Sequence, residues 1–303
     1  MVSQSHKKAV LTPITFFSWF KFPLTLPELR RYVWRQYLTE AEVAAAVQVL
    51  PGVCQADGLV WVGDWTPQRD LREQLAQKIW DKVEKWRWLF SYIPFVRQVY
   101  VTNTAAYNNV SENSDIDLLI IGQAKRLWTM RAVLLVIFNL LNLRVRSIDR
   151  FAKFSPEFYL SDKVLNTMPI AIERDYYLSY WLADLVPIWP DGEHRQFRQA
   201  NQWFSQDLPL AWHRPHLRKY RYLFPIWLRR LAEKILSGRW GDRLEDWVYT
   251  KQRRIIELNL RRLSVHPEVV ANRDIIKLHF NDRRAQVRDA IEQALNGLAG
   301  KNI

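Results

Sequence analysis

The sequence predicts an α+β protein in three parts: a winged-helix-like module over residues 1–66, a mixed-sheet core domain with a leading helix over 67–165, and a basic helical region over 166–303. Three observations predict this organisation. Two helix-start motifs and a tight-turn dipeptide lie close together near the N-terminus. Strand-like and helix-like runs then alternate through the middle of the chain. Helical periodicity dominates the remainder, where most of the formal net charge of +13 lies.

Residues 22–65 are typical of a small helical unit that ends in a hairpin. The stretches "TLPE" at 25–28 and "TEAE" at 39–42 each match a capping box, in which a threonine hydroxyl and a glutamate satisfy each other's free backbone donors. Asp57-Gly58 is a common tight-hairpin dipeptide. Helices followed by a hairpin suggest a winged helix that binds nucleic acid. A docking or dimerisation module of the same shape is the alternative, because the second helix carries few cations.

The middle part begins with a long amphipathic helix over about residues 67–92, whose tryptophans we interpret as core or interdomain packing. Strands are expected at 96–102 and 116–121, followed by a helix over roughly 126–142. A third extended segment is expected at 151–162. The order strand, turn, strand, helix, strand is an α/β pattern.

The composition indicates a globular chain with ample material for a core, since 49% of the residues are hydrophobic. The single Cys54 excludes an internal disulfide and a thiolate zinc cluster, which favours a cytoplasmic setting, and the N-terminus predicts no secretory signal. The most apolar run, at 132–141, is far shorter than the roughly 20 residues that span a bilayer. We therefore expect a buried helix there and no stable membrane insertion. The charge fits nucleic acid, nucleotides or an acidic membrane surface.

Two aspartates open the second expected strand, in "SDIDLLII". Residues two apart in a strand project to the same side, so Asp115 and Asp117 can present two carboxylates to one point. Two adjacent anions favour a cation between them, and Mg²⁺ takes carboxylates and substrate phosphates as ligands. Two such ions stabilise the attacking and leaving oxygens of a displacement at phosphorus. The pair therefore predicts phosphoryl or nucleotidyl transfer, and two solvated turn residues are the alternative.

This segment resembles the active-site region of the DNA polymerase β-like nucleotidyltransferase superfamily, in which a strand ends in Gly-Ser and a D-x-D motif opens the next strand. Here "VYVTNT" stands at the Gly-Ser place and "SDIDLLII" at the D-x-D place. From about residue 22 to 290 the chain is also similar to bacterial proteins described only as containing a nucleotidyltransferase domain, through "FPLT", "IPFVRQVYVT", "RLWTMR", "QANQWF" and "IIKLHFNDRR". The resemblance implies a nucleotidyltransferase-type mixed sheet and a reaction class, and it names no substrate.

The resemblance also implies roles for further residues. Thr104 matches the serine that holds the triphosphate, whereas Asn103 stands where glycine is expected. Asparagine tolerates a left-handed backbone better than most residues but adds a side chain where phosphate should lie. A third carboxylate, acting as metal ligand or base, is expected on the following strand. Glu157 is our candidate, beside a proline that implies an edge strand or a bulge, and Asp149 and Asp162 compete with it.

Arg126 and Arg131 follow the second strand and are candidates for binding the triphosphate, with Lys153 as another option and exposed, solvated arginines as the alternative. The favoured function is Mg²⁺-dependent transfer of a nucleoside monophosphate from an NTP to an acceptor hydroxyl, with two metal ions. RNA is the first guess for the acceptor, and a small molecule or a protein hydroxyl stays open. A catalytically silent protein that binds nucleotide or nucleic acid is the alternative, because Asn103 departs from the motif.

The basic C-terminal region interleaves cations with aromatic residues in "RKYRYLFPIWLRRLAEKIL" at 218–236. Such a mixture can stack bases and neutralise phosphates. Five apolar residues nevertheless fall on one helical face: Leu223, Trp227, Leu228, Leu231 and Ile235. We favour a core face opposite a solvated basic face over an RNA-binding groove.

Overall fold

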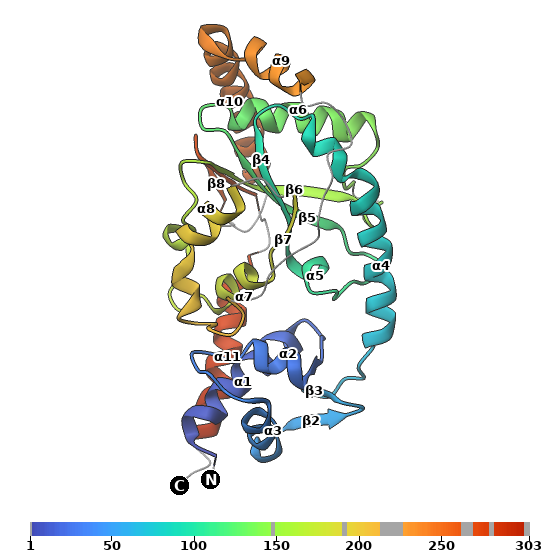
Figure 1. Ribbon diagram of the computed structural model, residues 1–303, viewed down its shortest axis with the longest axis vertical. Coiled ribbons are helices and arrows are strands. Elements are labelled where there is room, and N and C mark those ends of the chain that lie inside the picture. Colours follow the sequence, from blue (N-terminus) through green and yellow to red (C-terminus); the bar gives the residue numbers. More distant parts are fainter. Residues whose placement is uncertain are drawn as a thin grey trace.

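The computed structural model describes residues 2–146, 149–189, 193–212, 227–261, 269–278 and 282–299. Figure 1 shows an elongated molecule with a small N-terminal unit at one end, a sheet in the middle and the helices α9 and α10 at the other end. Both chain termini lie beside the N-terminal unit.

The N-terminal unit places three helices beside a three-stranded sheet of order β1-β3-β2. Its elements are α1 (Gln4–Trp19), β1 (Leu24–Thr25), α2 (Leu26–Arg31), α3 (Glu40–Val49), β2 (Val53–Ala56) and β3 (Leu59–Val62). Both predicted capping boxes form, at Thr25 with Glu28 and at Thr39 with Glu42. Asp57 and its neighbouring glycine have positive φ angles, as the predicted two-residue hairpin turn requires.

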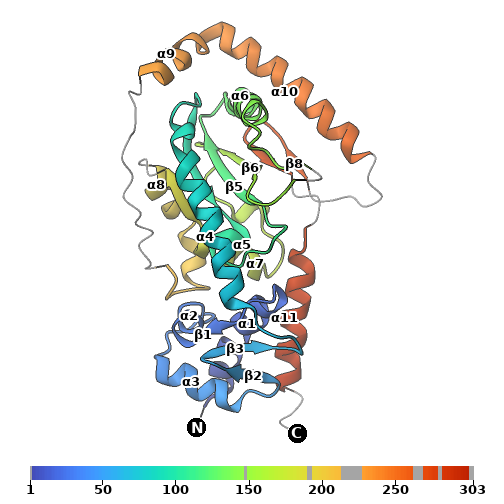
Figure 2. The same cartoon turned by 90° about the vertical axis from the view of Figure 1, so that its right-hand side faces the viewer.

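The helix α1 precedes the segment in which the sequence analysis expected the first helix, and it is almost entirely buried along its middle. It packs against α3 and against α11 (Arg284–Ala299), the last helix of the chain. Figure 2 shows α11 running alongside the N-terminal unit. The two ends of the sequence therefore build this unit together.

The central sheet has six strands in the order β7-β4-β5-β6-β9-β8 within the described residues. The strands are β4 (Val96–Val101), β5 (Ile116–Gly122), β6 (Phe154–Ser161), β7 (Val186–Trp189), β8 (Val270–Ala271) and β9 (Ile275–Lys277). Only β5 and β6 pair in parallel among these, and α6 (Leu127–Leu140) supplies the crossover that a parallel pair needs. The expected mixed helix and strand fold with an open mixed sheet is confirmed.

The remaining helices surround this sheet. They are α4 (Arg69–Trp86), α5 (Asn103–Ala106), α7 (Tyr176–Asp184), α8 (Glu193–Ala200), α9 (Trp227–Ile235) and α10 (Gly238–Leu260), with 3₁₀ turns at Arg87–Ser91, Met168–Ile170 and Gln202–Ser205. The last third of the chain was expected to be helical, but it also contributes the strands β7, β8 and β9.

Alternate residues of the strands enter two different cores. Leu118 and Ile120 of β5 pack with α4 and α6, while Leu119 and Ile121 face the other way, toward α7 and α1. Fully burying one such side chain contributes roughly 1.5–3 kcal/mol, so the alternation fixes the register of the sheet. The same alternation places Asp117 on the face of Leu119, toward α7.

The apolar run at 132–141 forms α6 and its C-cap as predicted, but the expectation that this helix is buried holds for one side only. Leu134 and Phe138 are buried against the sheet, whereas Val136 and Leu140 are exposed, Leu140 to 79%. None of the helices in the described ranges combines the length and the apolar character that a membrane span requires.

Candidate functional site

The candidate site lies where β4 ends and β5 begins. These two strands are antiparallel neighbours, so the turn after β4 lies beside the first residues of β5. The backbone N–H of Thr102 donates to the carbonyl oxygen of Asp117 at 3.0 Å, which holds the two segments together. The resemblance named these two segments as the Gly-Ser and D-x-D places, and the fold brings them into contact.

Asn103 begins α5 with a φ of 54°, in the left-handed region that favours glycine. Its side-chain amide donates to Oδ2 of Asp117 at 2.8 Å. The hydroxyl of Tyr177, from α7, donates in turn to Oδ1 of Asn103 at 3.1 Å. The asparagine thus keeps the backbone shape of the expected glycine, and its added side chain is held against Asp117 and Tyr177.

Asp115 and Asp117 are both half-buried. Burial and the charge of Asp115 together raise the pKa of Asp117 to about 7, against the opposing hydrogen bond from Asn103. The only cation that is hydrogen bonded to Asp115 within the described residues is Arg150, whose Nη2 donates at 3.1 Å and whose side chain is 54% exposed. The aspartate pair therefore carries more negative charge than its surroundings neutralise.

Glu157 occupies a β-bulge. Leu118 pairs with Pro156 and Leu119 with Phe158, so Glu157 is the extra residue of β6. The expected bulge is present, although β6 is an interior strand rather than an edge strand. Burial and the charge of Asp115 raise the pKa of Glu157.

The charge of Asp115 contributes to the raised pKa of both Asp117 and Glu157, but the three carboxylates do not gather around one point. Among the described residues, no group of three or more His, Cys, Asp or Glu side chains is arranged to hold one metal ion. The structure thus brings Asp115 and Asp117 together with Asn103, and it leaves Glu157 within electrostatic range only.

Thr104 lies in the turn with its side chain half-buried. Its carbonyl oxygen accepts from the N–H of Asn109 at 2.8 Å, while its hydroxyl has no hydrogen-bond partner in the described part of the chain. A hydroxyl in this state is ready to donate to a ligand.

Arg126 is not brought to the aspartates, because it follows the opposite end of β5. Its buried guanidinium donates to the carbonyl oxygens of Leu236 and Gly238 and pairs with Asp242 at 2.8 Å. Arg126 therefore ties the α9–α10 connection to the sheet. A role in binding triphosphate requires it to leave these contacts.

Arg131 belongs to α6, and its buried side chain lies over the ring of Tyr159 and donates to the side chain of Gln252. It lies within electrostatic range of Glu157, and burial lowers its pKa. Neither Arg131 nor Arg126 is an exposed, solvated arginine, which was the alternative prediction, because both are at most 7% exposed.

The competing candidates have structural contacts. Lys153 donates to the carbonyl oxygen of Asn142 at 2.8 Å and pairs with Asp149 at 2.9 Å. Asp162 accepts from the N–H of Ala124 at 2.8 Å, at the far end of β5 from the aspartate pair. The polar groups of Lys153, Asp149 and Asp162 are therefore accounted for by contacts within the protein.

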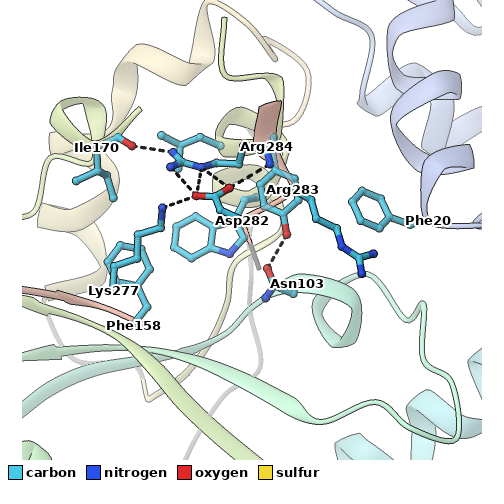
Figure 3. Close-up of a pocket in the computed structure, with 11 residues that line it drawn as sticks. Phe20, Asn103, Phe158, Ile170, Lys277, Asp282, Arg283 and Arg284 are labelled. Carbon is cyan, nitrogen blue, oxygen red and sulfur yellow. Dashed lines mark hydrogen bonds and ion pairs between the residues drawn. The ribbon is translucent and has the colours of Figure 1, made fainter. Parts of the chain in front are cut away.

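A pocket of about 110 Å³ adjoins the aspartate pair, with Asn103 in its wall (Figure 3). The residues around it come from the N-terminal unit, the sheet, α5, α7, the 3₁₀ turn at Met168–Ile170 and the start of α11: Phe20, Asn103, Phe158, Ile170, Tyr177, Leu178, Trp181, Lys277, Asp282, Arg283 and Arg284. Most are apolar or aromatic, and three are cationic.

An ion cluster at the edge of the pocket was not assigned by the sequence analysis. Asp282 accepts from Nζ of Lys277 at 2.8 Å and from Arg284 (Figure 3). Arg284 also pairs with Asp175 at 2.9 Å. These cations hold the pKa of Asp282 well below its usual range, although burial opposes them. The only sequence signal was the landmark "IIKLHFNDRR", which contains Lys277, Asp282 and Arg284 but indicates no role.

Comparison with models of protein families, with curated proteins and with solved structures finds no match for this chain.

Proposed function

We propose that the chain is a Mg²⁺-dependent nucleotidyltransferase that moves a nucleoside monophosphate from an NTP to an acceptor hydroxyl. The observation that carries the proposal is the contact between the turn after β4 and the D-x-D at the start of β5. Asn103 has the left-handed backbone that the Gly-Ser motif uses, and it hydrogen bonds to Asp117.

The aspartate pair fits a hard divalent cation by its chemistry. It offers only carboxylate oxygens, which Mg²⁺ prefers, and burial and the neighbouring charge of Asp115 raise the pKa of Asp117, a shift that a bound cation would oppose. Asp115 and Asp117 are the residues that would hold the metal, and the bound metal would stabilise charge at the reacting phosphate. Glu157, in its bulge, is the candidate for a base or further ligand.

Residues around the pair are suited to hold the nucleotide. The Thr104 hydroxyl has no hydrogen-bond partner among the residues that the structure describes, and it lies in the same turn as Asn103, where it can donate to a phosphate oxygen. The pocket is smaller than the 300–1,000 Å³ of typical ligand sites, so it suits one ring-sized group rather than a whole nucleotide. Its apolar and aromatic lining favours a base or another flat group over a phosphate.

The proposed acceptor is RNA, on the basis of the N-terminal unit and the charge. The order of helices and hairpin in that unit is the order expected of a winged helix, and the chain carries a net charge of +13. If no label is transferred to RNA in the test below, a small molecule or a protein hydroxyl is the proposed acceptor.

The test incubates the purified chain with Mg²⁺ and each of four α-³²P-labelled NTPs, with and without total RNA. We expect label in RNA from the unmodified chain, and none from Asp115→Asn or Asp117→Asn variants that keep the native circular dichroism spectrum. Asp57→Asn is the matched control, because it makes the same chemical change at an exposed turn where Asn-Gly is equally suitable. Collapse of the fold in either site variant would show that the carboxylates are structural and would overturn the proposal.

A second function, nucleotide or nucleic-acid binding without catalysis, is favoured by one specific contact. The amide of Asn103 donates to Oδ2 of Asp117, and this hydrogen bond competes with a metal for the same oxygen. Mn²⁺ binding, followed by electron paramagnetic resonance, separates the two functions. A silent protein keeps its affinity for nucleotide or RNA after Asp117→Asn and shows no Mn²⁺ bound at the pair.

A further inference from the structure

The end of the molecule formed by α6, α9 and α10 exposes an unusual amount of apolar surface. Most of the exposed large hydrophobic side chains in the described residues belong to these helices and to the C-cap of α6: Val136, Leu140, Leu141, Trp227, Leu228, Leu231, Ile235, Trp240, Trp247, Ile255 and Leu258. Figure 2 shows α9 and α10 along the end of the molecule opposite the termini. We call these residues the apical face.

The helix α9 is attached to the protein by its polar side. Arg229 is buried and donates to the carbonyl oxygen of Val96, and Glu233 accepts from the N–H of Phe95 at 2.7 Å. The apolar side, which the sequence analysis interpreted as a core face, is exposed instead: Trp227 to 59% and Ile235 to 66%. That interpretation was wrong for the described residues, and Leu223 lies outside them. A helix held by its ion pairs and exposing its apolar side is arranged to contact something other than its own core.

The helix α10 continues the same pattern over a greater length. At 100° per residue, Trp240, Trp247 and Leu258 share one stripe of the helix, and all three are exposed. Val248 and Ile256 are buried on the other side. Helix α10 therefore packs against α6 with one face and leaves a second apolar face uncovered.

Cations flank the stripe of α10. Arg243, Lys251 and Arg254 are exposed and fall within about 60° of its centre. The acidic residues Asp242 and Asp246 fall well away from that centre, toward the back of the helix. Tryptophan and aliphatic side chains bordered by lysine and arginine are typical of helices that lie in the headgroup region of a membrane.

We propose that the apical face binds the surface of an anionic phospholipid bilayer, with α9 and α10 lying in the plane of the headgroups. The helices would insert tryptophan and aliphatic side chains, while the flanking cations contact lipid phosphates and carboxylates. A second copy of the chain is a poorer partner, because two identical cationic faces repel each other. RNA is also a poorer partner, because the face is largely aliphatic and nucleic acids bind through cations and stacked aromatic rings.

The test measures co-sedimentation of the full chain with vesicles of phosphatidylcholine alone and with vesicles that contain phosphatidylserine. We expect binding to the anionic vesicles, and much weaker binding to the neutral vesicles or in high salt. An apolar variant carries Trp227→Ser, Leu231→Ser, Trp240→Ser and Trp247→Ser, all at exposed positions, and we expect it to lose at least tenfold in partitioning. A charge variant carries Arg243→Gln, Lys251→Gln and Arg254→Gln. Each lost cation should cost roughly fivefold in partitioning, so the total loss is about a hundredfold.

Two control variants match these changes elsewhere on the surface. One carries Tyr37→Ser, Val49→Ser, Leu71→Ser and Met168→Ser, which remove four exposed hydrophobic side chains. The other carries Lys8→Gln, Lys78→Gln and Lys163→Gln, which remove three exposed charges. The proposal requires both controls to bind as the unmodified chain does, and circular dichroism must show that every variant is folded.

Other outcomes overturn the proposal. Vesicle binding that the apolar and charge variants leave unchanged would mean that another face contacts lipid. Absence of vesicle binding, together with binding of a fluorescent single-stranded RNA that the apolar variant loses, would assign the face to nucleic acid. A concentration-dependent dimer in sedimentation equilibrium that the apolar variant abolishes would assign it to a second copy of the chain.

Discussion

The two acidic clusters around the pocket have opposite electrostatics, although both are partly removed from water. Lys277 and Arg284 surround Asp282, and they hold its pKa below the usual range. Asp117 faces another carboxylate, and its pKa is raised to about 7. The first cluster is neutralised by two buried cations, whereas the second has only the exposed Arg150 beside it within the described residues.

This difference distinguishes a structural acid from a candidate ligand-binding acid. A buried carboxylate that the fold needs for stability is given cations and hydrogen bonds, because burying an unpaired charge is costly. A pair of carboxylates that the protein leaves uncompensated destabilises the folded state until a cation from solution arrives. Substitutions should therefore have opposite effects on the stability of the fold at the two clusters.

The largest expected effect is at the compensated cluster. Asp282→Asn removes the carboxylate partner of the buried Lys277 and one of the two carboxylates that pair with Arg284, and we expect it to lower the free energy of unfolding by about 3–5 kcal/mol. Urea denaturation followed by circular dichroism measures this loss. Asp289→Asn is the matched control, because that aspartate is 67% exposed, and it should change stability by less than about 0.5 kcal/mol. Equal effects of the two substitutions would contradict the contrast between the clusters.

The second prediction concerns the uncompensated pair in the absence of divalent cations. The folded-state pKa of Asp117 is about 7, above the unfolded value near 3.8, so the unfolded chain releases this proton first as pH rises. The contribution of Asp117 to stability is then fully present below pH 4 and is lost as pH rises to 7. We expect Asp117→Asn to match the unmodified chain at pH 4 and to exceed its free energy of unfolding at pH 8, by about 1 kcal/mol.

Addition of Mg²⁺ should reverse this order at pH 8. A cation that binds only the folded state raises the melting temperature of the unmodified chain, and the variant has lost the carboxylate that binds it. Thermal unfolding with Mg²⁺ and with EDTA measures both effects. If Asp117→Asn were less stable than the unmodified chain in EDTA at pH 8, the pair would be compensated after all.

The third prediction separates the backbone of Asn103 from its side chain. Asn103→Gly keeps the left-handed backbone and frees Oδ2 of Asp117, so we expect tighter Mn²⁺ binding and a stability within about 1 kcal/mol of the unmodified chain. Asn103→Ala also frees that oxygen, but a φ of 54° is strained for alanine, and we expect it to be about 1 kcal/mol less stable than Asn103→Gly. Urea denaturation and electron paramagnetic resonance of Mn²⁺ compare the two variants. Equal stability would show that the turn does not require a left-handed backbone.

Features with local causes were predictable from the sequence. The capping box of Thr25 and Glu28 depends on residues three apart, and the hairpin turn at Asp57 depends on the Asp-Gly dipeptide itself. Partners distant in the sequence were not predictable. Arg126 contacts Leu236 and Gly238, more than a hundred residues later, and nothing near Arg126 in the chain indicates this.

The error on α9 has a related cause. Helical periodicity shows that a helix has an apolar side, but it does not show which side will face the protein. Glu233 of α9 accepts from the N–H of Phe95, and that contact turns the polar side inward. The role of Asn103 could be predicted only in part for the same reason. Its positive φ was foreseeable from the residue type, whereas the direction of its side-chain amide depends on Tyr177 of α7.

The smallest effect on stability is expected at Arg150, the cation that partly neutralises the aspartate pair. Its guanidinium lies 3.1 Å from Oδ2 of Asp115 but is 54% exposed, so Arg150→Gln should change the free energy of unfolding by less than about 1 kcal/mol. The same substitution removes a competitor for the carboxylate, and Mn²⁺ affinity should rise. Lys163→Gln, which removes an exposed charge elsewhere, is the control in both measurements. Because Arg150 affects Asp115 mainly through charge, the gain in affinity should shrink in high salt, and a gain that persists there would mean that Arg150 blocks the site by its bulk.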